Sequence, residues 1–432
     1  MANIILKNTT TEQMIAQMET DAQYDITDFD PVVTDEGPDL GEIVSHIHAK
    51  SAPPTVPKLF LAGHCIFNCA YCGCRSSYDK TAYCHEPREL AKTAVQMAKN
   101  NGHGVFVTSA IYKNADYTEE RILQTIKHMR QDEGYRGYIH AKVMPGTDPL
   151  LIRAVSRFAD RMSVNIEVAK SEGYLRVAHQ KNKNNILTPM QNISDIIAEN
   201  KLDRTPNRGK IALSQSTQLM AGSSDEDDRT IMVLARAMYK KYGLKRIYYT
   251  SFQYRNIVEG YDLPLTATPT WRMRRLYQAD RLLQLYGFSP DDVTPEISPF
   301  LDADIDPKAA FALRNLDMYP VEINKADYET LIRVPGIGLT YAMKIIEARK
   351  YCTLTHDLLK KIGVSLKRAI YFITCNGKYL GGNVMGTPTL RLKMAVDSGI
   401  NGDLGTNATQ RFFDKNFKPS DLPQDPFKSK FK

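Results

Sequence analysis

The sequence predicts an α/β protein in which a partial (β/α)6 barrel is followed by a small all-α module. Three features favour this fold: six short apolar runs alternate with helical patterns after residue 57, a cysteine cluster follows the first run, and glycine turns separate apolar helices near residue 335. The chain has 432 residues, enough for two or three domains of roughly 150 residues each. It contains no apolar stretch long enough to span a membrane.

The composition indicates a soluble, cytoplasmic protein. Hydrophobic residues make up 43% of the chain and charged residues 24%, and the N-terminal residues lack the basic start and apolar segment of a secretory signal. The chain has seven cysteines, an odd number, and four of them are clustered between positions 65 and 74. This pattern disfavours a disulfide framework and favours metal chemistry.

An acidic arm is expected over residues 1–56, ahead of a basic body. Residues 1–50 hold ten carboxylates against two lysines, so this part carries a net charge of −8 and the remainder carries +15. The asymmetry suggests a polyanionic partner that the arm mimics or covers; a solvated acidic extension with no such role explains it equally well.

The barrel is expected over residues 57–288. Its predicted strands span 58–62, 104–109, 137–144, 161–168, 210–214 and 245–252. Helical spacing is found over 87–99, 117–130, 148–158, 225–242 and 270–286. Six strand–helix units are too few for a closed eight-stranded barrel, which leaves an open partial barrel or a doubly wound sheet.

Three further segments follow the predicted barrel. Residues 289–319 are rich in Asp and Pro and are interpreted as a linker. Residues 320–380 form a helical module with an internal repeat at an offset of 27, in which Gly336 and Ala342 correspond to Gly363 and Ala369. Residues 381–432 are rich in Gly, Asn, Pro and Lys and predict a weakly structured basic tail.

Three thiols with C-x3-C-x2-C spacing, Cys65, Cys69 and Cys72, directly follow the first predicted strand. Three thiolates on one loop hold three irons of a cubane cluster and leave the fourth iron open to a substrate. A structural zinc site that uses Cys74 as its fourth ligand is the alternative, because four thiolates satisfy tetrahedral zinc. Against zinc, Cys72 and Cys74 form a tighter pair than the two separated pairs that zinc sites usually use.

This motif, with Tyr71 before its last cysteine, resembles that of the radical S-adenosylmethionine (SAM) superfamily over about residues 58–286. The resemblance implies a partial six-stranded barrel and a [4Fe–4S] cluster held by the three cysteines, whose open iron binds SAM. Members of the superfamily usually have glycines and a glutamate after the second strand. These residues are absent here, so the resemblance implies only backbone contacts from this segment to SAM. The cofactor-binding residues expected are Tyr71, Ser109, Ala110, Lys142, Asn165, Glu167 and Gly222.

The polar residues of two predicted strands share a face. Asn165 and Glu167 alternate with apolar residues in the fourth strand, as His140 and Lys142 do in the third. We expect Asn165 and Glu167 to contact ribose or carboxylate groups and Lys142 to pair with the methionine carboxylate. The alternative is the polar face of a half-buried strand. Gly222 resembles part of an adenine-binding turn, where a glycine lets the backbone approach the ring.

Residues 331–344 resemble a helix-hairpin-helix motif. The N–H groups of its turn and second helix point outward and can bind one phosphate. Residues 320–380 carry ten Lys or Arg against five Asp or Glu, so a sequence-independent grip on a nucleic-acid backbone is predicted. A hairpin that only packs, or that binds protein, is the alternative. The nucleic-acid-binding residues expected are Gly336, Ile337, Gly338, Thr340, Lys344, Lys367 and Arg368.

Segments 24–26, 137–142, 160–167 and 319–326 narrow the resemblance to a radical SAM family assigned to DNA modification and repair, often encoded beside a uracil-DNA-glycosylase-like protein. The resemblance implies DNA repair or base modification through a 5′-deoxyadenosyl radical. The partners it implies are DNA more than RNA, the glycosylase-like protein, and an electron donor such as flavodoxin or ferredoxin. The alternatives are RNA or tRNA modification, and a non-enzymatic iron–sulfur protein that recruits a glycosylase.

Cys84 is a candidate catalytic residue. It follows the cluster loop by twelve residues. A thiol is a suitable hydrogen donor to a substrate radical because its S–H bond is weaker than the surrounding C–H bonds. The alternative is a buried, inert thiol.

Overall fold

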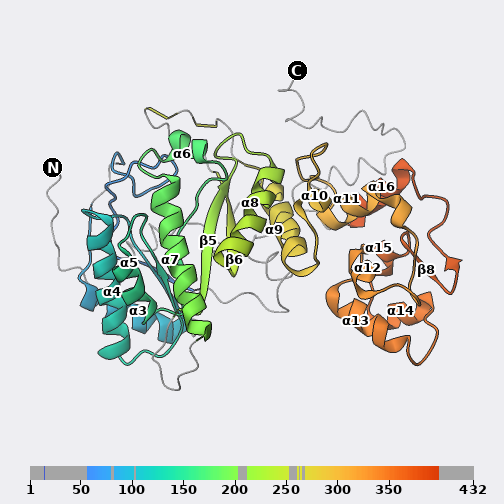
Figure 1. Ribbon diagram of the computed structural model, residues 1–432, viewed down its shortest axis with the longest axis horizontal. Coiled ribbons are helices and arrows are strands. Elements are labelled where there is room, and N and C mark those ends of the chain that lie inside the picture. Colours follow the sequence, from blue (N-terminus) through green and yellow to red (C-terminus); the bar gives the residue numbers. More distant parts are fainter. Residues whose placement is uncertain are drawn as a thin grey trace. The chain divides into compact units, whose positions relative to one another are not determined.

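A computed structural model describes Met14 and residues 56–78, 82–101, 104–202, 212–252, 260–261, 263–264 and 268–397. These residues form two compact units, coloured along the sequence in Figure 1. The first unit takes in the described residues up to 283 together with 288–301, and the second takes in 284–287 and 302–397. The predicted acidic arm and most of the predicted basic tail lie outside the described residues.

The first unit is built on a six-stranded parallel sheet. Its strands pair in sequence order without reversal. A doubly wound sheet would reverse its strand order at a switch point, so that alternative is excluded. The edge strands β1 and β6 do not pair with each other, which confirms the predicted open, partial (β/α)6 barrel. The strands are β1 (Lys58–Phe60), β2 (Val105–Thr108), β3 (Ile139–Lys142), β4 (Arg161–Ser163), β5 (Ser214–Ala221) and β6 (Arg246–Ser251).

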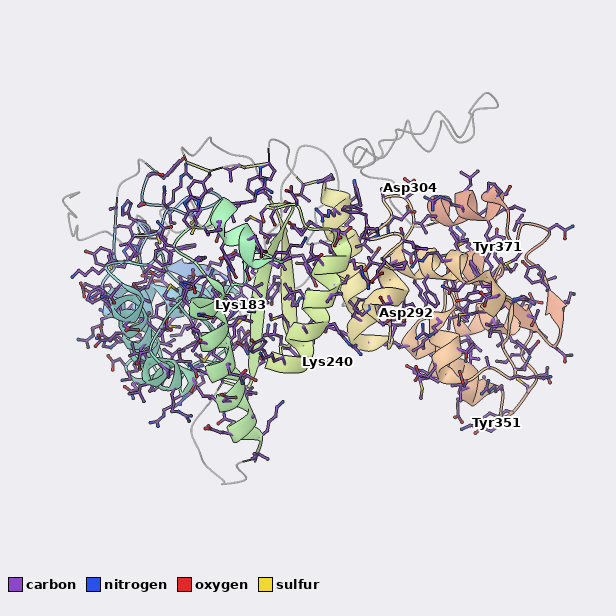
Figure 2. All side chains as sticks on the ribbon, turned by 45° about the horizontal axis from the view of Figure 1, so that its top comes forward. Lys183, Lys240, Asp292, Asp304, Tyr351 and Tyr371 are labelled. Atoms are coloured by element: carbon purple, nitrogen blue, oxygen red, sulfur yellow. The ribbon has the colours of Figure 1, made fainter. Side chains whose placement is uncertain are left out.

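The helices of this unit begin at capping side chains that the sequence supplies. Asn114, Asp148 and Asp227 each accept a hydrogen bond from a first-turn N–H group of the helix that follows. Lys183 and Lys240 mark α7 and α8 in Figure 2. The helices are α3 (Pro87–Asn101), α4 (Ala115–Gln131), α5 (Pro149–Ser156), α6 (Ser171–Val177), α7 (Lys183–Leu202), α8 (Asp228–Tyr242), α9 (Thr270–Leu285) and α10 (Pro290–Val293).

The fifth strand lies further along the chain than predicted. It was expected at 210–214, but β5 begins at Ser214 and continues through a polar run in which Gln215, Ser216 and Thr217 are at most 1% exposed. The side chain of Thr217 donates to the Val164 carbonyl at 2.7 Å and accepts from the Ile166 N–H at 2.9 Å. Thr217 is thus hydrogen-bonded inside the protein, and the polar composition of this run shows no hydrophobic pattern from which the buried strand could be predicted.

The sequence predicts an all-α second unit, but this unit also contains a small β-sheet. The short strands β7 (Val321–Glu322), β8 (Ile373–Cys375) and β9 (Lys378–Tyr379) form a three-stranded sheet in that order. Strands of two or three residues are too short to show a two-residue hydrophobic period, so no pattern in the sequence marks them. The helices are α11 (Pro307–Arg314), η1 (Leu316–Met318), α12 (Tyr328–Arg333), α13 (Leu339–Ala348), α14 (His356–Ile362), α15 (Leu366–Ala369) and α16 (Pro388–Asp397).

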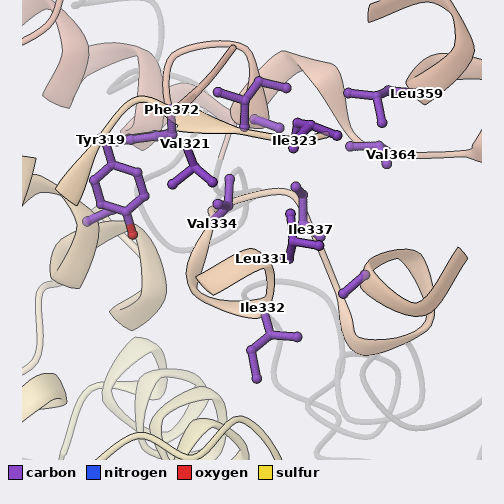
Figure 3. Packing of buried hydrophobic residues seen from close by; sticks show 14 of the residues in the cluster. Tyr319, Val321, Ile323, Leu331, Ile332, Val334, Ile337, Leu359, Val364 and Phe372 are labelled. Atoms are coloured by element: carbon purple, nitrogen blue, oxygen red, sulfur yellow. The ribbon is translucent and has the colours of Figure 1, made fainter. Parts of the chain in front are cut away.

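Segments expected to be a linker and a tail contribute to the core of this unit. Ile305, Ala309 and Ala312 of the predicted linker are fully buried, as are Leu390 and Met394 of α16. Figure 3 shows how the same core gathers residues from β7, α12 and the loops around them. The boundary between the units therefore falls at residues 301–302, within the segment interpreted as a linker.

Among the helices of the described residues, none is long and apolar enough to cross a bilayer.

Candidate cluster and cofactor site

One pocket brings together the thiols and most of the residues expected to bind the cofactor. Because parallel strands all end at the same edge of the sheet, the loops after β1, β2, β3 and β4 meet there. The predicted residues that line this pocket are Cys65, Cys69, Tyr71, Cys72, Ser109, Ala110, Lys142, Asn165 and Glu167.

The cysteine loop is fixed by backbone hydrogen bonds to its own end and to its neighbours. The Cys65 N–H donates to the Cys74 carbonyl at 2.7 Å, which closes the loop. The Ile66 N–H donates to the Ile111 carbonyl at 2.9 Å, which ties the loop to the segment after β2. The three thiols thus occupy a loop that is already folded around the pocket.

Two of the three sulfurs accept backbone hydrogen bonds. The Phe67 N–H donates to Cys65 Sγ and the Cys74 N–H donates to Cys72 Sγ, both at 3.3 Å. Hydrogen bonds of this kind stabilise the negative charge on a cluster-ligating thiolate.

Burial favours the protonated form of Cys65 and Cys69 in the absence of a metal. Burial raises the pKa of Cys65, and the neighbouring Cys72 raises it further. Burial likewise raises the pKa of Cys69 to about 12. Metal binding supplies the positive charge that these sulfurs need in order to ionise, and releases their protons.

Cys65, Cys69, Cys72 and Cys74 all line the pocket. A single zinc ion would need its thiolates at about 2.3 Å from one centre, whereas a cubane would take each thiolate on a different iron. Among the described residues, which include all four of these cysteines, no three His, Cys, Asp or Glu side chains converge on one ion site.

Glu167 lies beyond the end of β4 in a left-handed conformation, with φ at +63°. Its backbone bridges to β5: the Glu167 N–H donates to the Gln218 carbonyl at 3.0 Å, and its carbonyl accepts from the Met220 N–H at 2.7 Å. A left-handed non-glycine residue is strained, and such residues concentrate at functional sites. The bridge holds the Glu167 carboxylate, which is 4% exposed, in the pocket wall.

Lys181 also lines the pocket, although nothing in the sequence marks it as a site residue. Its Nζ donates to Glu167 Oε1 at 2.7 Å and to the Tyr71 hydroxyl at 3.0 Å. Lys181 lies in the connection between α6 and α7, where neither a motif nor a hydrophobic period marks it. Only the fold brings it beside the cysteine loop.

Two predicted site residues lie outside the lining of this pocket. Gly222 has φ at +82° and donates its N–H to Glu226 Oε1 at 2.6 Å, and a β-carbon at this position would collide with the Thr268 hydroxyl. Cys84 forms an antiparallel bridge with Ala62, and burial raises the pKa of its thiol. Gly222 is thus required by close packing, and Cys84 lies beside the segment that follows β1.

The two polar side chains of β3, His140 and Lys142, have different surroundings. Lys142 lines the pocket. His140 instead stacks on Phe106 with 4.1 Å between ring centroids, and its Nε2 lies 2.8 Å from Ser163 Oγ. Of the two side chains, only Lys142 is placed to meet a cofactor.

The predicted nucleic-acid-binding residues fall into a buried group and an exposed group. Ile337 is 1% exposed and packs in the core, while Arg368 is ion-paired with Asp306. Thr340, Lys344 and Lys367 are exposed. Ile337 and Arg368 therefore stabilise the unit, which leaves the other three side chains available to a ligand.

The two helical hairpins of this unit share a capping pattern. Asp327 and Thr355 cap the helices before the turns, α12 and α14, with side-chain hydrogen bonds. Gly338 and Ser365, at the start of the helices after the turns, α13 and α15, make no such bond. The first N–H groups of α13 are thus left without a side-chain acceptor.

Comparisons with solved structures find matches at low similarity. HydG, a maturase of the [FeFe]-hydrogenase, has 16% identity and a TM-score of 0.39, with 52% of this chain and 48% of HydG covered. HydG from Carboxydothermus hydrogenoformans has 11% identity and a TM-score of 0.41, with 73% and 70% covered. The radical S-adenosylmethionine methyltransferase TsrM from Kitasatospora setae, with cobalamin and a [4Fe–4S] cluster bound, has 10% identity and a TM-score of 0.34, with 46% and 37% covered.

The first of these matches spans about half the length of HydG. No protein-family model and no curated protein matches the chain. The function proposed below therefore rests on the residues of the site itself.

Proposed function

We propose that this protein is a radical SAM enzyme. The observation that carries the proposal is the meeting of Cys65, Cys69 and Cys72 with side chains from four strand ends in one pocket of an open six-stranded barrel. The three thiols would ligate a [4Fe–4S] cluster and leave one iron open. When bound together, the cluster and SAM supply a 5′-deoxyadenosyl radical that abstracts hydrogen from an unactivated C–H bond.

The residues around the thiols would bind and shield the cofactor. Lys142 and Asn165 offer a cation and an amide to the polar methionine part of SAM. Phe60, Ile111 and Met144 line the same pocket and are at most 6% exposed. Apolar walls of this kind exclude water from a reactive intermediate.

The test is anaerobic reconstitution followed by metal analysis and a SAM cleavage assay. We expect about four irons per chain and 5′-deoxyadenosine formation under a strong reductant. Cys65→Ala, Cys69→Ala and Cys72→Ala should each abolish both. Cys74→Ala is the matched control, because Cys74 supports the loop through its backbone N–H and carbonyl, which alanine retains. Zinc in place of iron, or loss of the cluster in the Cys74 variant alone, would contradict the assignment.

We propose further that the substrate is nucleic acid, with DNA favoured over RNA. The support is the first turn of α13, whose N–H groups have no side-chain cap, together with the exposed Lys344 and Lys367. A nucleotide inside a duplex must be extruded before its carbon atoms reach a pocket, so single-stranded or mismatched DNA should react best. Fluorescence anisotropy with matched DNA and RNA oligonucleotides tests this; tighter binding of RNA would reverse the preference.

A further inference from the structure

Lys181 places a positive charge beside the cysteine loop. Its side chain lines the same pocket as Cys65, Cys69 and Cys72. Its Nζ donates to the hydroxyl of Tyr71, the residue directly before Cys72 in the chain. The cation therefore forms part of the wall that surrounds the three thiols.

The position of this ammonium group is fixed on several sides. The Lys181 side chain is 11% exposed and its Nζ bonds to both Glu167 and Tyr71. The Nζ also lies 5.7 Å from the centre of the Tyr71 ring. Burial alone would lower the pKa of Lys181, but the Glu167 carboxylate, together with Cys69 and Cys72, outweighs burial and raises it, so the amine stays charged.

The segment that carries Lys181 is itself bound to the cysteine loop. The Val177 carbonyl accepts from the Ala70 N–H at 2.8 Å, and Gln180 Oε1 accepts from the Asn68 N–H at 3.3 Å. Ala70 lies between Cys69 and Cys72, and Asn68 directly precedes Cys69. A displacement of this loop would move Lys181 with it, so the distance from the cation to the thiols is held constant.

We propose that Lys181 is a positioning residue that holds Tyr71 and Glu167 around the cluster and raises the reduction potential of the cluster. The inference rests on the proposed radical SAM function. Reduction by a donor protein of the flavodoxin or ferredoxin kind moves one electron from the donor to the cluster and no proton. Three thiolates already make the site anionic, so a neighbouring cation stabilises the reduced form more than the oxidised form.

The role predicts opposite shifts for the two members of the ion pair. Lys181→Met removes the cation and should lower the midpoint potential, while Glu167→Gln removes the opposing anion and should raise it. We expect the Met variant to lower the ratio of reduced to oxidised cluster about tenfold at the wild-type midpoint, a shift of about 59 mV for one electron. Lys181→Arg keeps the charge and should stay closest to the wild type.

The measurement is a redox titration of the reconstituted full-length protein, without SAM, followed by electron paramagnetic resonance of the reduced cluster. Lys183→Met is the matched control, because Lys183 is exposed at the start of α7, two residues from Lys181, and its loss should leave the potential unchanged. If Lys181→Met retains no iron, the sign of the shift in Glu167→Gln decides.

The outcomes separate this inference from the function on which it rests. A wild-type protein that takes up no iron–sulfur cluster contradicts the proposed function. If the wild-type protein holds a cluster and both Lys181→Met and Glu167→Gln have the same midpoint potential as the wild type, the inference is overturned but the proposed function is not. Shifts of the same sign in both variants also overturn it, because a purely structural role disturbs the loop in the same way from either partner.

Discussion

Gly336 lies directly against Ser365: a β-carbon on Gly336 would come 2.6 Å from the Ser365 carbonyl oxygen. Gly363, at the equivalent position 27 residues later, packs against the Tyr341 ring, where a β-carbon would come within 2.9 Å. Both glycines have positive φ, +87° and +99°. The repeat seen in the sequence thus corresponds to two turns, each of which packs on the other hairpin.

Gly336→Ala should therefore destabilise the second unit by several kcal/mol. A left-handed alanine alone costs roughly 1–2 kcal/mol, and the contact with the rigid Ser365 backbone adds to this cost. Gly386→Ala is the matched control, because Gly386 has φ at +73° with nothing within 4 Å of an added β-carbon. Thermal unfolding with peptide-level hydrogen exchange over 328–369 checks the difference. Equal losses in the two variants would show that the contact contributes nothing.

The exposed lysines, by contrast, should affect nucleic-acid binding without affecting stability. Lys344→Ala and Lys367→Ala should each flatten the slope of log affinity against log salt by about one unit, since each removes one phosphate contact. Lys350→Ala is the control, because Lys350 is already paired with Glu347 at 2.6 Å. Anisotropy at several salt concentrations gives the slopes. Slopes equal to that of the wild type in both variants would indicate a protein-binding hairpin.

The features of the fold and the site that could be read from the sequence are those with a local signal. The spacing of the three cysteines and the position of Gly336 and Gly363 in the repeat are read directly from the chain. Lys181 and β5 have no such signal. Lys181 reaches the pocket only because the connection after α6 folds onto the cysteine loop, and β5 begins with a buried polar run that shows no hydrophobic pattern.

Glu322 should make the second unit sensitive to acid. Its carboxylate accepts backbone N–H bonds from Asn324, Asn376 and Gly377 at 2.8–3.1 Å, which joins β7 to the β8–β9 turn. Burial raises the pKa of Glu322, but these hydrogen bonds outweigh it and lower the pKa to about 2. The stabilisation is fully present above the ordinary pKa of 4.5 and is lost as the pH falls towards 2.

Glu322→Gln should remove this dependence. Thermal unfolding between pH 5 and pH 2 should show a midpoint that falls more steeply for the wild type than for the variant. Glu329→Gln is a suitable control, because Glu329 is exposed on α12 and lies outside the β-sheet contacts. If the wild type and the Gln variant lose stability in parallel, the carboxylate does not hold the sheet through its charge.

Lys308 should make the stability of the same unit depend on pH in a second way, because burial lowers the pKa of its amine. Its Nζ donates to the Ile337 carbonyl at 2.5 Å and lies 4.9 Å from the Tyr286 ring centre. Burial lowers the pKa of this amine from 10.5 to about 7. Between these values the unfolded chain binds the proton and the folded chain does not, so this group makes the free energy of unfolding rise with pH from about 7 to about 10.5.

Lys308→Met cannot bind that proton, so its stability relative to the wild type should be greatest below pH 7 and should decline as the pH rises towards 10. The measurement is the difference in unfolding midpoint between variant and wild type at pH 6, 8 and 9.5. The exposed Lys325→Met serves as the control, and its difference from the wild type should not vary with pH. A constant difference for Lys308→Met as well would mean that the amine beneath the hairpin turn keeps its proton throughout, held there by the Ile337 carbonyl.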